Sequence, residues 1–299
     1  MSRLVPVGTV MAVALALCMG CEQGQTTQGD DGEGEAAAKP LAGKTLSIFV
    51  GSASKPATEE AVERFEEKTG CEVRQSYGGS GDMLTKLELT QRARKGDIYF
   101  PGSSDFMELA KEKKLVDPDT EEIIVYLVPA INVPADNPKN IKRVEDLAGP
   151  GVRLGIARPD TVCVGLYAVE VLVKNGLAEQ VRPNIVTHAE SCAKTAQLAA
   201  LGTVDAVLGW RVFQYWNPDK ITTVMLEPEQ IPRIGYIPIA ISRFCEQPEV
   251  AQAFIDFLLS AEGKAIYRKW HYFATADEAR KFTEADTPVG GAWALPEGW

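Results

Sequence analysis

Two consecutive units of the same kind, between residues 46 and 86, constrain the fold of this chain more than any other stretch. In the first, Leu46–Val50 is rich in β-branched and aromatic residues and predicts a strand, which enters the Gly/Ser turn 51–54. In the second, Glu72–Tyr77 predicts a strand that enters the turn 78–81. Apolar residues recur at helical spacing after both turns, so each unit predicts strand, turn and helix. This alternation is typical of α/β folds with a largely parallel sheet.

Both turns place serine hydroxyls where a helix is expected to begin. Ser52 and Ser80 lie beside backbone N–H groups that have no partner inside the helix, and the helix dipole adds partial positive charge there. One serine before a helix is usually only an N-cap, but the same arrangement in successive units favours an anion site. Neither turn ends in the Gly-Lys-Ser/Thr of phosphate loops or has Gly-x-Gly-x-x-Gly spacing, which disfavours a nucleotide.

The remaining pattern predicts two α/β lobes, each a mostly parallel sheet flanked by helices. A long apolar strand at 122–133 is expected to cross into the second lobe, and a strand at 236–241 to return. The expected boundaries are 45–128 plus 234–299 for lobe 1 and 129–233 for lobe 2. Such a fold has a ligand cleft between its lobes and closes by hinge motion.

The N-terminus predicts export and a lipid anchor. Residues 1–20 combine a short positive start with an apolar run that is too short to span a membrane. This run ends in Gly-Cys and resembles a bacterial lipoprotein signal, although Cys18 stands where leucine is usual. We expect cleavage before Cys21 and lipid on its sulfur, with an ordinary secretory signal as the alternative. Residues 21–44 are polar and predict a flexible acidic tether, so the protein is expected in the periplasm or otherwise outside the cytoplasm, held to the membrane.

Charge and motif content limit the functions that the chain can have. The net charge of -10 at pH 7 argues against nucleic acid as a partner, but not against a small anion held by a few aimed dipoles. No Gly-x-Ser-x-Gly elbow is present, and His188 and His271 have no partner at metal-ligand spacing. We therefore expect neither an enzyme nor a metal or other cofactor.

Three segments together resemble the periplasmic molybdate- and tungstate-binding proteins of ABC importers. They are Val-Gly-Ser-Ala-Ser-Lys-Pro at 50–56, Tyr-Gly-Gly-Ser-Gly at 77–81 and Lys-Gly-Asp-Ile-Tyr-Phe-Pro-Gly at 95–102. The resemblance extends over roughly residues 46–273. It implies the two-lobe fold of type II periplasmic binding proteins and capture of a tetrahedral oxyanion. It also implies delivery to an importer permease, by a protein that is expected to be a monomer.

The resemblance also implies which residues hold the ligand. Ser52 and Ser80 would supply hydroxyl groups from the first lobe. Matching Gly165-Leu166-Tyr167 to the Gly-Ile-Tyr of the family places the backbone N–H of Val164 on the ligand, and a second match places the N–H of Cys192 there.

The family's ligand-binding tyrosine falls at or next to Gly209 in this chain. The sequence departs from the family here, because neither Gly209 nor its two neighbours in the chain is a tyrosine. The adjacent Trp210 is expected either to donate its indole N–H to the ligand or to pack in the core.

Two cysteines, Cys163 and Cys192, fall at the pocket-lining turns of the second lobe. Three interpretations are open for them: a disulfide, thiolates that hold arsenite or a soft metal, or independent buried thiols. Cys71 and Cys245 form another candidate pair in the first lobe. The sequence thus predicts a solute-binding lipoprotein for molybdate or tungstate. There are two alternatives. The first is a thiol-dependent receptor for arsenite or a soft metal, and the second is a sensor-type binding protein.

Overall fold

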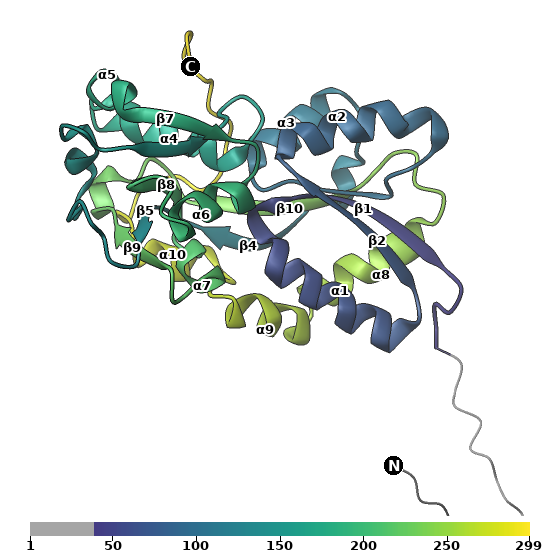
Figure 1. Cartoon of the computed structure of the whole chain (residues 1–299). Helices are drawn as coiled ribbons and strands as arrows, with labels where there is room; N and C mark the ends of the chain where they lie inside the picture. The colour runs from purple at the N-terminus through teal and green to yellow at the C-terminus, as the bar shows by residue number, and fades with distance from the viewer. Residues whose placement is uncertain (1–38) are drawn as a thin grey trace, which may run out of the picture. The chain divides into compact units, whose positions relative to one another are not determined.

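The computed structural model describes residues 39–299 and contains two lobes, each built around one five-stranded sheet (Figure 1). The first sheet has the order β2-β1-β3-β10-β4, and the second has the order β7-β6-β8-β5-β9. The strands are β1 Thr45–Gly51, β2 Glu72–Gly78, β3 Ile98–Phe100, β4 Glu122–Leu127, β5 Pro129–Pro134, β6 Leu154–Ala157, β7 Ile185–Ala189, β8 Ala206–Trp210, β9 Ile221–Met225 and β10 Gly235–Ile241. The α-helices are α1 Lys55–Thr69, α2 Ser80–Thr90, α3 Ser104–Glu112, α4 Cys163–Lys174, α5 Ala178–Val181, α6 Cys192–Ala200, α7 Phe213–Trp216, α8 Pro248–Leu259, α9 Ala261–Lys269 and α10 Ala276–Arg280.

Each sheet contains both parallel and antiparallel pairings. In the first lobe β1 pairs in parallel with β2 and β3, and in the second β6 pairs in parallel with β7 and β8. The antiparallel pairs involve β4 and β10 in the first sheet and β5 and β9 in the second. These four strands adjoin the segments that carry the chain between the sheets. The predicted two-lobe α/β fold is confirmed, with mixed sheets.

The long strand predicted at 122–133 is two strands that belong to different sheets. β4 pairs with β10 in the first sheet, and β5 pairs with β8 and β9 in the second. The buried Val128 lies between them, at the point where the backbone changes its partners. The chain returns between β9 and β10, and Phe273 later pairs with Tyr126 of β4 in an isolated antiparallel bridge.

The two lobes pack directly against each other. The core of the first lobe contains aromatic contacts such as Phe65 with Phe254, whose ring centroids are 5.2 Å apart. The same hydrophobic cluster also includes Cys163 and Cys192, which begin helices of the second lobe. A continuous cluster across the lobe boundary means that the cleft is closed in this structure.

The described chain begins close to the end of the predicted tether. The Leu41 N–H donates to the Thr69 carbonyl at 2.8 Å, and the Glu72 N–H donates to the Lys44 carbonyl at 2.9 Å. The predicted signal segment, Cys21 and the first part of the tether lie outside the described residues. Within the part of the chain that the structure describes, no helix has the length and apolar character that crossing a membrane requires.

Candidate functional site

Three turns of the first lobe come together where the parallel strands β1, β2 and β3 end. Ser52 follows β1, Ser80 follows β2 and begins α2, and Gly102 follows β3. The Gly102 N–H donates to Ser80 Oγ at 2.9 Å, and both serines are buried. The carboxyl ends of parallel strands lie at one edge of a sheet, which is why ligands bind there in open α/β folds.

Two of these turns need glycine because other atoms approach their backbone closely. A Cβ atom on Gly51 would lie 2.7 Å from Ser80 Oγ. A Cβ atom on Gly102 would lie 2.8 Å from the Ala53 Cβ and 2.5 Å from Cys163 Sγ, which belongs to the second lobe. The lack of a side chain at Gly102 therefore lets the two lobes touch at the centre of the cleft.

The second lobe contributes the first turns of α4 and α6. Cys163 is the first residue of α4 and Cys192 the first residue of α6, and their Sγ atoms are 3.5 Å apart. Both side chains are about 1% exposed, and in this structure both are free thiols. Burial, and next the neighbouring Cys192, raises the pKa of the Cys163 thiol well above its usual value, so Cys163 is protonated at neutral pH.

Hydrogen bonds join these turns across the cleft. The Ala193 N–H of α6 donates to Ser52 Oγ at 3.3 Å, and the Gly81 N–H of α2 donates to the Thr161 carbonyl at 2.8 Å. The beginnings of α2, α4 and α6 thus converge with the Ser52 turn in one buried place. Hydroxyl groups and helix N-termini that point together favour a small anion.

Comparison with known proteins identifies the family to which the chain belongs. A profile of the bacterial extracellular solute-binding proteins matches residues 46–273. The chain belongs to this family. A binding protein from Haemophilus influenzae is 27% identical over 218 residues, which cover 73% of this chain and 86% of that protein. The molybdate-binding protein ModA from Rhodobacter capsulatus is 26% identical over 265 residues, which cover 87% of this chain and 94% of that protein.

The solved structures agree on the fold. The periplasmic molybdate-binding protein of Azotobacter vinelandii matches with a TM-score of 0.67 and 17% identity, over 77% of this chain and 99% of that one. The resemblance inferred from the three sequence segments is confirmed at the level of the family and the fold. As a member of an extracellular solute-binding family, the protein works outside the cytoplasm.

The structure of this solute-binding protein brings several of the predicted ligand residues together. Against the larger effect of burial, Ser80 and the backbone of Val164 lie close enough to the Cys163 thiol to lower its pKa. Ser52 meets α6 at the residue next to Cys192. The proximity of these five residues is a feature of the closed cleft, and their contact with a ligand stays a prediction.

Trp210, the sixth predicted residue, ends β8 and is fully buried. Its ring packs edge-to-face against Tyr167, with the centroids 4.8 Å apart. Among the described residues its indole nitrogen has no hydrogen-bond partner. The ring contacts show how Trp210 packs, and the donation of its N–H to a ligand stays a prediction.

The sequence reasoning missed the third serine turn of the first lobe. Gly102 lies against Ser80, and Ser103 is fully buried with a hydroxyl that has no partner among the described residues. A signal was available, because Gly-Ser-Ser at 102–104 follows the apolar Ile-Tyr-Phe at 98–100 just as the other two turns follow their strands. Ala193, whose N–H reaches Ser52, was missed as well, since only the tertiary contact identifies it.

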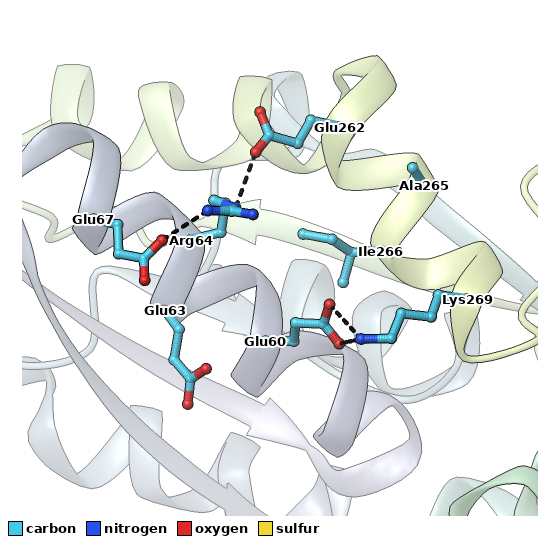
Figure 2. A pocket seen from close by; sticks show the side chains of 8 residues that line it. All are labelled: Glu60, Glu63, Arg64, Glu67, Glu262, Ala265, Ile266 and Lys269. Carbon is cyan, nitrogen blue, oxygen red and sulfur yellow. Dashed lines mark hydrogen bonds and ion pairs between the residues drawn. The ribbon is translucent and has the colours of Figure 1, made fainter.

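A separate acidic groove lies between α1 and α9 of the first lobe, with a volume of about 380 Å³ (Figure 2). Both cations that line it pair with carboxylates of the groove. Lys269 pairs with Glu60 at 2.9 Å, and Arg64 pairs with Glu262 at 3.2 Å. The groove belongs to one lobe and is distinct from the place where the serine turns converge.

Proposed function

We propose that this solute-binding protein captures a tetrahedral oxyanion, molybdate or tungstate, in the periplasm and delivers it to the permease of an ABC importer. The observation that carries the proposal is the convergence of Ser52 and Ser80 with the beginnings of α4 and α6 in one buried cleft. Relatives that are named molybdate-binding proteins support this ligand. A lipid on Cys21 would hold the protein to the membrane near its permease.

The ligand would bind by exchanging its water shell for fixed donors. A dianion gives up strong hydration on entry, and only well-placed hydrogen-bond donors replace it. Ser52 and Ser80 would donate hydroxyls from the first lobe, and Val164 and Cys192 would donate backbone N–H groups from the second. Because the donors come from both lobes, the ligand has higher affinity for the closed state and shifts the protein towards it.

A thermal-shift panel of the mature protein with molybdate, tungstate, sulfate and phosphate tests the proposal. A ligand at 100 times its dissociation constant should add about 2.7 kcal/mol to the free energy of unfolding. Replacing Ser52 or Ser80 with alanine should weaken molybdate binding by roughly 10- to 100-fold, since hydrogen bonds to charged groups contribute about 1.5–3 kcal/mol. Calorimetric titration measures the change.

The matched control for these substitutions is Ser76→Ala. Ser76 lies on β2 close to Ser80, but its hydroxyl accepts an exposed hydrogen bond from Lys86 instead of facing the cleft. This variant should keep wild-type affinity. If none of the four oxyanions stabilises the wild-type protein, the proposed ligand class is wrong.

A thiol-dependent receptor for arsenite is a second candidate, because the Cys163 and Cys192 sulfur atoms are only 3.5 Å apart. Arsenous acid would form two As–S bonds and release two water molecules as the two thiols lose their protons. The raised pKa of Cys163 leaves little of the nucleophilic thiolate at neutral pH, which slows the formation of these bonds. Among the described residues no cluster of three or more His, Cys, Asp or Glu could add further ligands for a soft metal.

The replacement Cys163→Ser separates the two candidates. Arsenite should stabilise only the reduced wild-type protein, and the serine variant should lose this effect, because a single thiol cannot chelate. Molybdate binding should change little, because the substitution removes none of the proposed donors, which are the hydroxyls of Ser52 and Ser80 and two backbone N–H groups. Arsenite binding that survives in Cys163→Ser would exclude the thiol-dependent function.

A further inference from the structure

The last residues of the chain run along the boundary between the lobes, beyond the 46–273 segment that matches the family (yellow in Figure 1). Val289 pairs in parallel with Ile234, which lies just before β10 where the chain returns to the first lobe. The Ile234 N–H donates to the Pro288 carbonyl and the Gly290 N–H donates to the Ile234 carbonyl, both at 2.8 Å. Residues 288–290 thus add a strand-like segment beside one of the connections between the lobes.

The tail next contacts the first lobe. The Gly291 carbonyl accepts a hydrogen bond from Ser104 Oγ at 2.7 Å, and the Trp293 N–H donates to Asp105 Oδ1 at 2.9 Å. Ser104 and Asp105 form the first turn of α3, directly after the Gly102 turn of the candidate site. The tail is therefore bonded to the first lobe beside the candidate site.

The tail then continues onto the second lobe. Trp293, Leu295 and Trp299 pack against the hydrophobic core of that lobe. The Arg182 guanidinium lies 4.8 Å from the centroid of the Trp299 ring and donates to the Gly298 carbonyl. Within about ten residues the chain therefore binds one lobe and then the other, as a strap across their boundary.

A buried arginine joins the strap and both lobes at one point. Arg233 Nη2 donates to Asp105 of α3 at 2.9 Å, and its Nε donates to Glu170 of α4 at 2.8 Å. Its remaining nitrogen, Nη1, donates to the Gly291 carbonyl of the tail at 2.7 Å. Arg233 is only 4% exposed, so these three partners replace water around the guanidinium.

The positive charge of Arg233 means that its ion pairs with Asp105 and Glu170 form only when the lobes are closed. Burial alone would lower the pKa of Arg233, but Tyr167 and the two carboxylates around it raise the pKa overall, so the group stays charged. A buried ion pair stabilises only when its geometry is complete, and losing one partner leaves an uncompensated charge. Because Asp105 and Glu170 belong to different lobes, separating the lobes breaks this geometry.

We propose that Arg233, Asp105 and Glu170, together with residues 288–299, form a latch that holds the two lobes closed and slows release of the bound solute. The latch acts on the conformation of the protein, so only its effect on solute release rests on the proposed function. Asp105 and Arg233 are positioning residues, because they would hold the two lobes together without touching the solute.

Hydrogen exchange at the Gly81 amide tests the latch directly. This N–H is bonded to Thr161 of the other lobe, so it is protected only while the cleft is closed. In ligand-free Asp105→Asn protein, and in a chain that ends at residue 290, we expect Gly81 to exchange roughly tenfold faster or more, while the amides of β1 keep their protection. Dissociation of molybdate should accelerate in the same two variants.

Glu262→Gln is the matched control. It also changes a carboxylate to an amide in an ion pair, but Glu262 pairs with Arg64 within the first lobe. Unchanged exchange at Gly81 in both test variants, or equal acceleration at Gly81 and in β1, would overturn the latch, since the network would then have no specific role in closure. If molybdate fails to bind even wild-type protein, the proposed solute is wrong, while exchange in the ligand-free protein still decides the latch.

Discussion

Replacing Arg233 with methionine should lower the free energy of unfolding by about 3–5 kcal/mol at pH 7, the loss expected when one partner of a buried ion pair is removed. Methionine fills similar space, but it leaves the carboxylates of Asp105 and Glu170 buried without their cation. Urea denaturation followed by circular dichroism measures this change. A loss below about 1 kcal/mol would show that the buried charges are compensated in another way.

The effect of this substitution should depend on pH. Burial already raises the pKa of Glu170, and removing Arg233, which lowers it, should raise it further. A carboxyl group whose pKa is higher in the folded than in the unfolded protein supports folding at low pH and loses this contribution as the pH rises. The difference between wild type and variant should therefore shrink when the pH is lowered from 7 towards 5.

Arg182→Met is the matched control for this prediction. Arg182 also binds the C-terminal tail, but its hydrogen bond to Gly298 is exposed. Contacts of this kind contribute about 0–1 kcal/mol, so this variant should unfold nearly like the wild type. If Arg182→Met lowers the free energy of unfolding as much as Arg233→Met does, the stability comes from the tail in general and not from the buried charges.

Replacing Gly102 with alanine should weaken oxyanion binding by about 10- to 100-fold, which corresponds to the 1–3 kcal/mol typical of overpacking. The new methyl group would meet Ala53 of the first lobe and Cys163 of the second at distances that real Cβ atoms do not tolerate. The lobes can relieve this overlap by separating, so the variant should favour the open cleft. Calorimetric titration with molybdate and small-angle scattering of the ligand-free protein measure both effects.

Gly155→Ala is the control for a crowded glycine that lies away from the cleft. A Cβ atom there would meet the end of the Leu198 side chain at 2.9 Å, entirely within the second lobe. This variant should lose some stability but keep its affinity for molybdate. If Gly102→Ala binds molybdate as tightly as the wild type, the contact between Gly102 and Cys163 has no role in closure.

Local pattern was enough to predict the elements that carry the candidate site. The strands at 46–50 and 72–77 follow from side-chain pattern and from the Gly/Ser turns after them, and the structure has β1 and β2 there. These features depend on residues within a few positions of one another. The two-lobe fold and the serine turns could therefore be predicted from the amino-acid sequence alone.

Contacts between distant segments were beyond the reach of the same reasoning. The chain changes from one sheet to the other at Val128, and this change depends on the strands that pair on either side of it. The apolar pattern of the sequence continues through Val128 without a break. The 3.5 Å approach of Cys163 and Cys192 depends on two helices that begin side by side, although 29 residues separate them. The residues next to Arg233 in the sequence do not predict that it is buried or that it has three hydrogen-bond partners.

The alternation of apolar residues and Gly/Ser turns in this chain specifies strands, helices and helix starts, because these form through local backbone preferences and the burial of one face. Sheet order, lobe closure and the path of residues 288–299 were decided by the tertiary structure alone. They depend on which surfaces exclude water together, and on charges such as Arg233 and Glu170, which lie 63 residues apart and meet only after folding. The serine turns of the candidate site could thus be predicted from local sequence, whereas the latch that we propose could not.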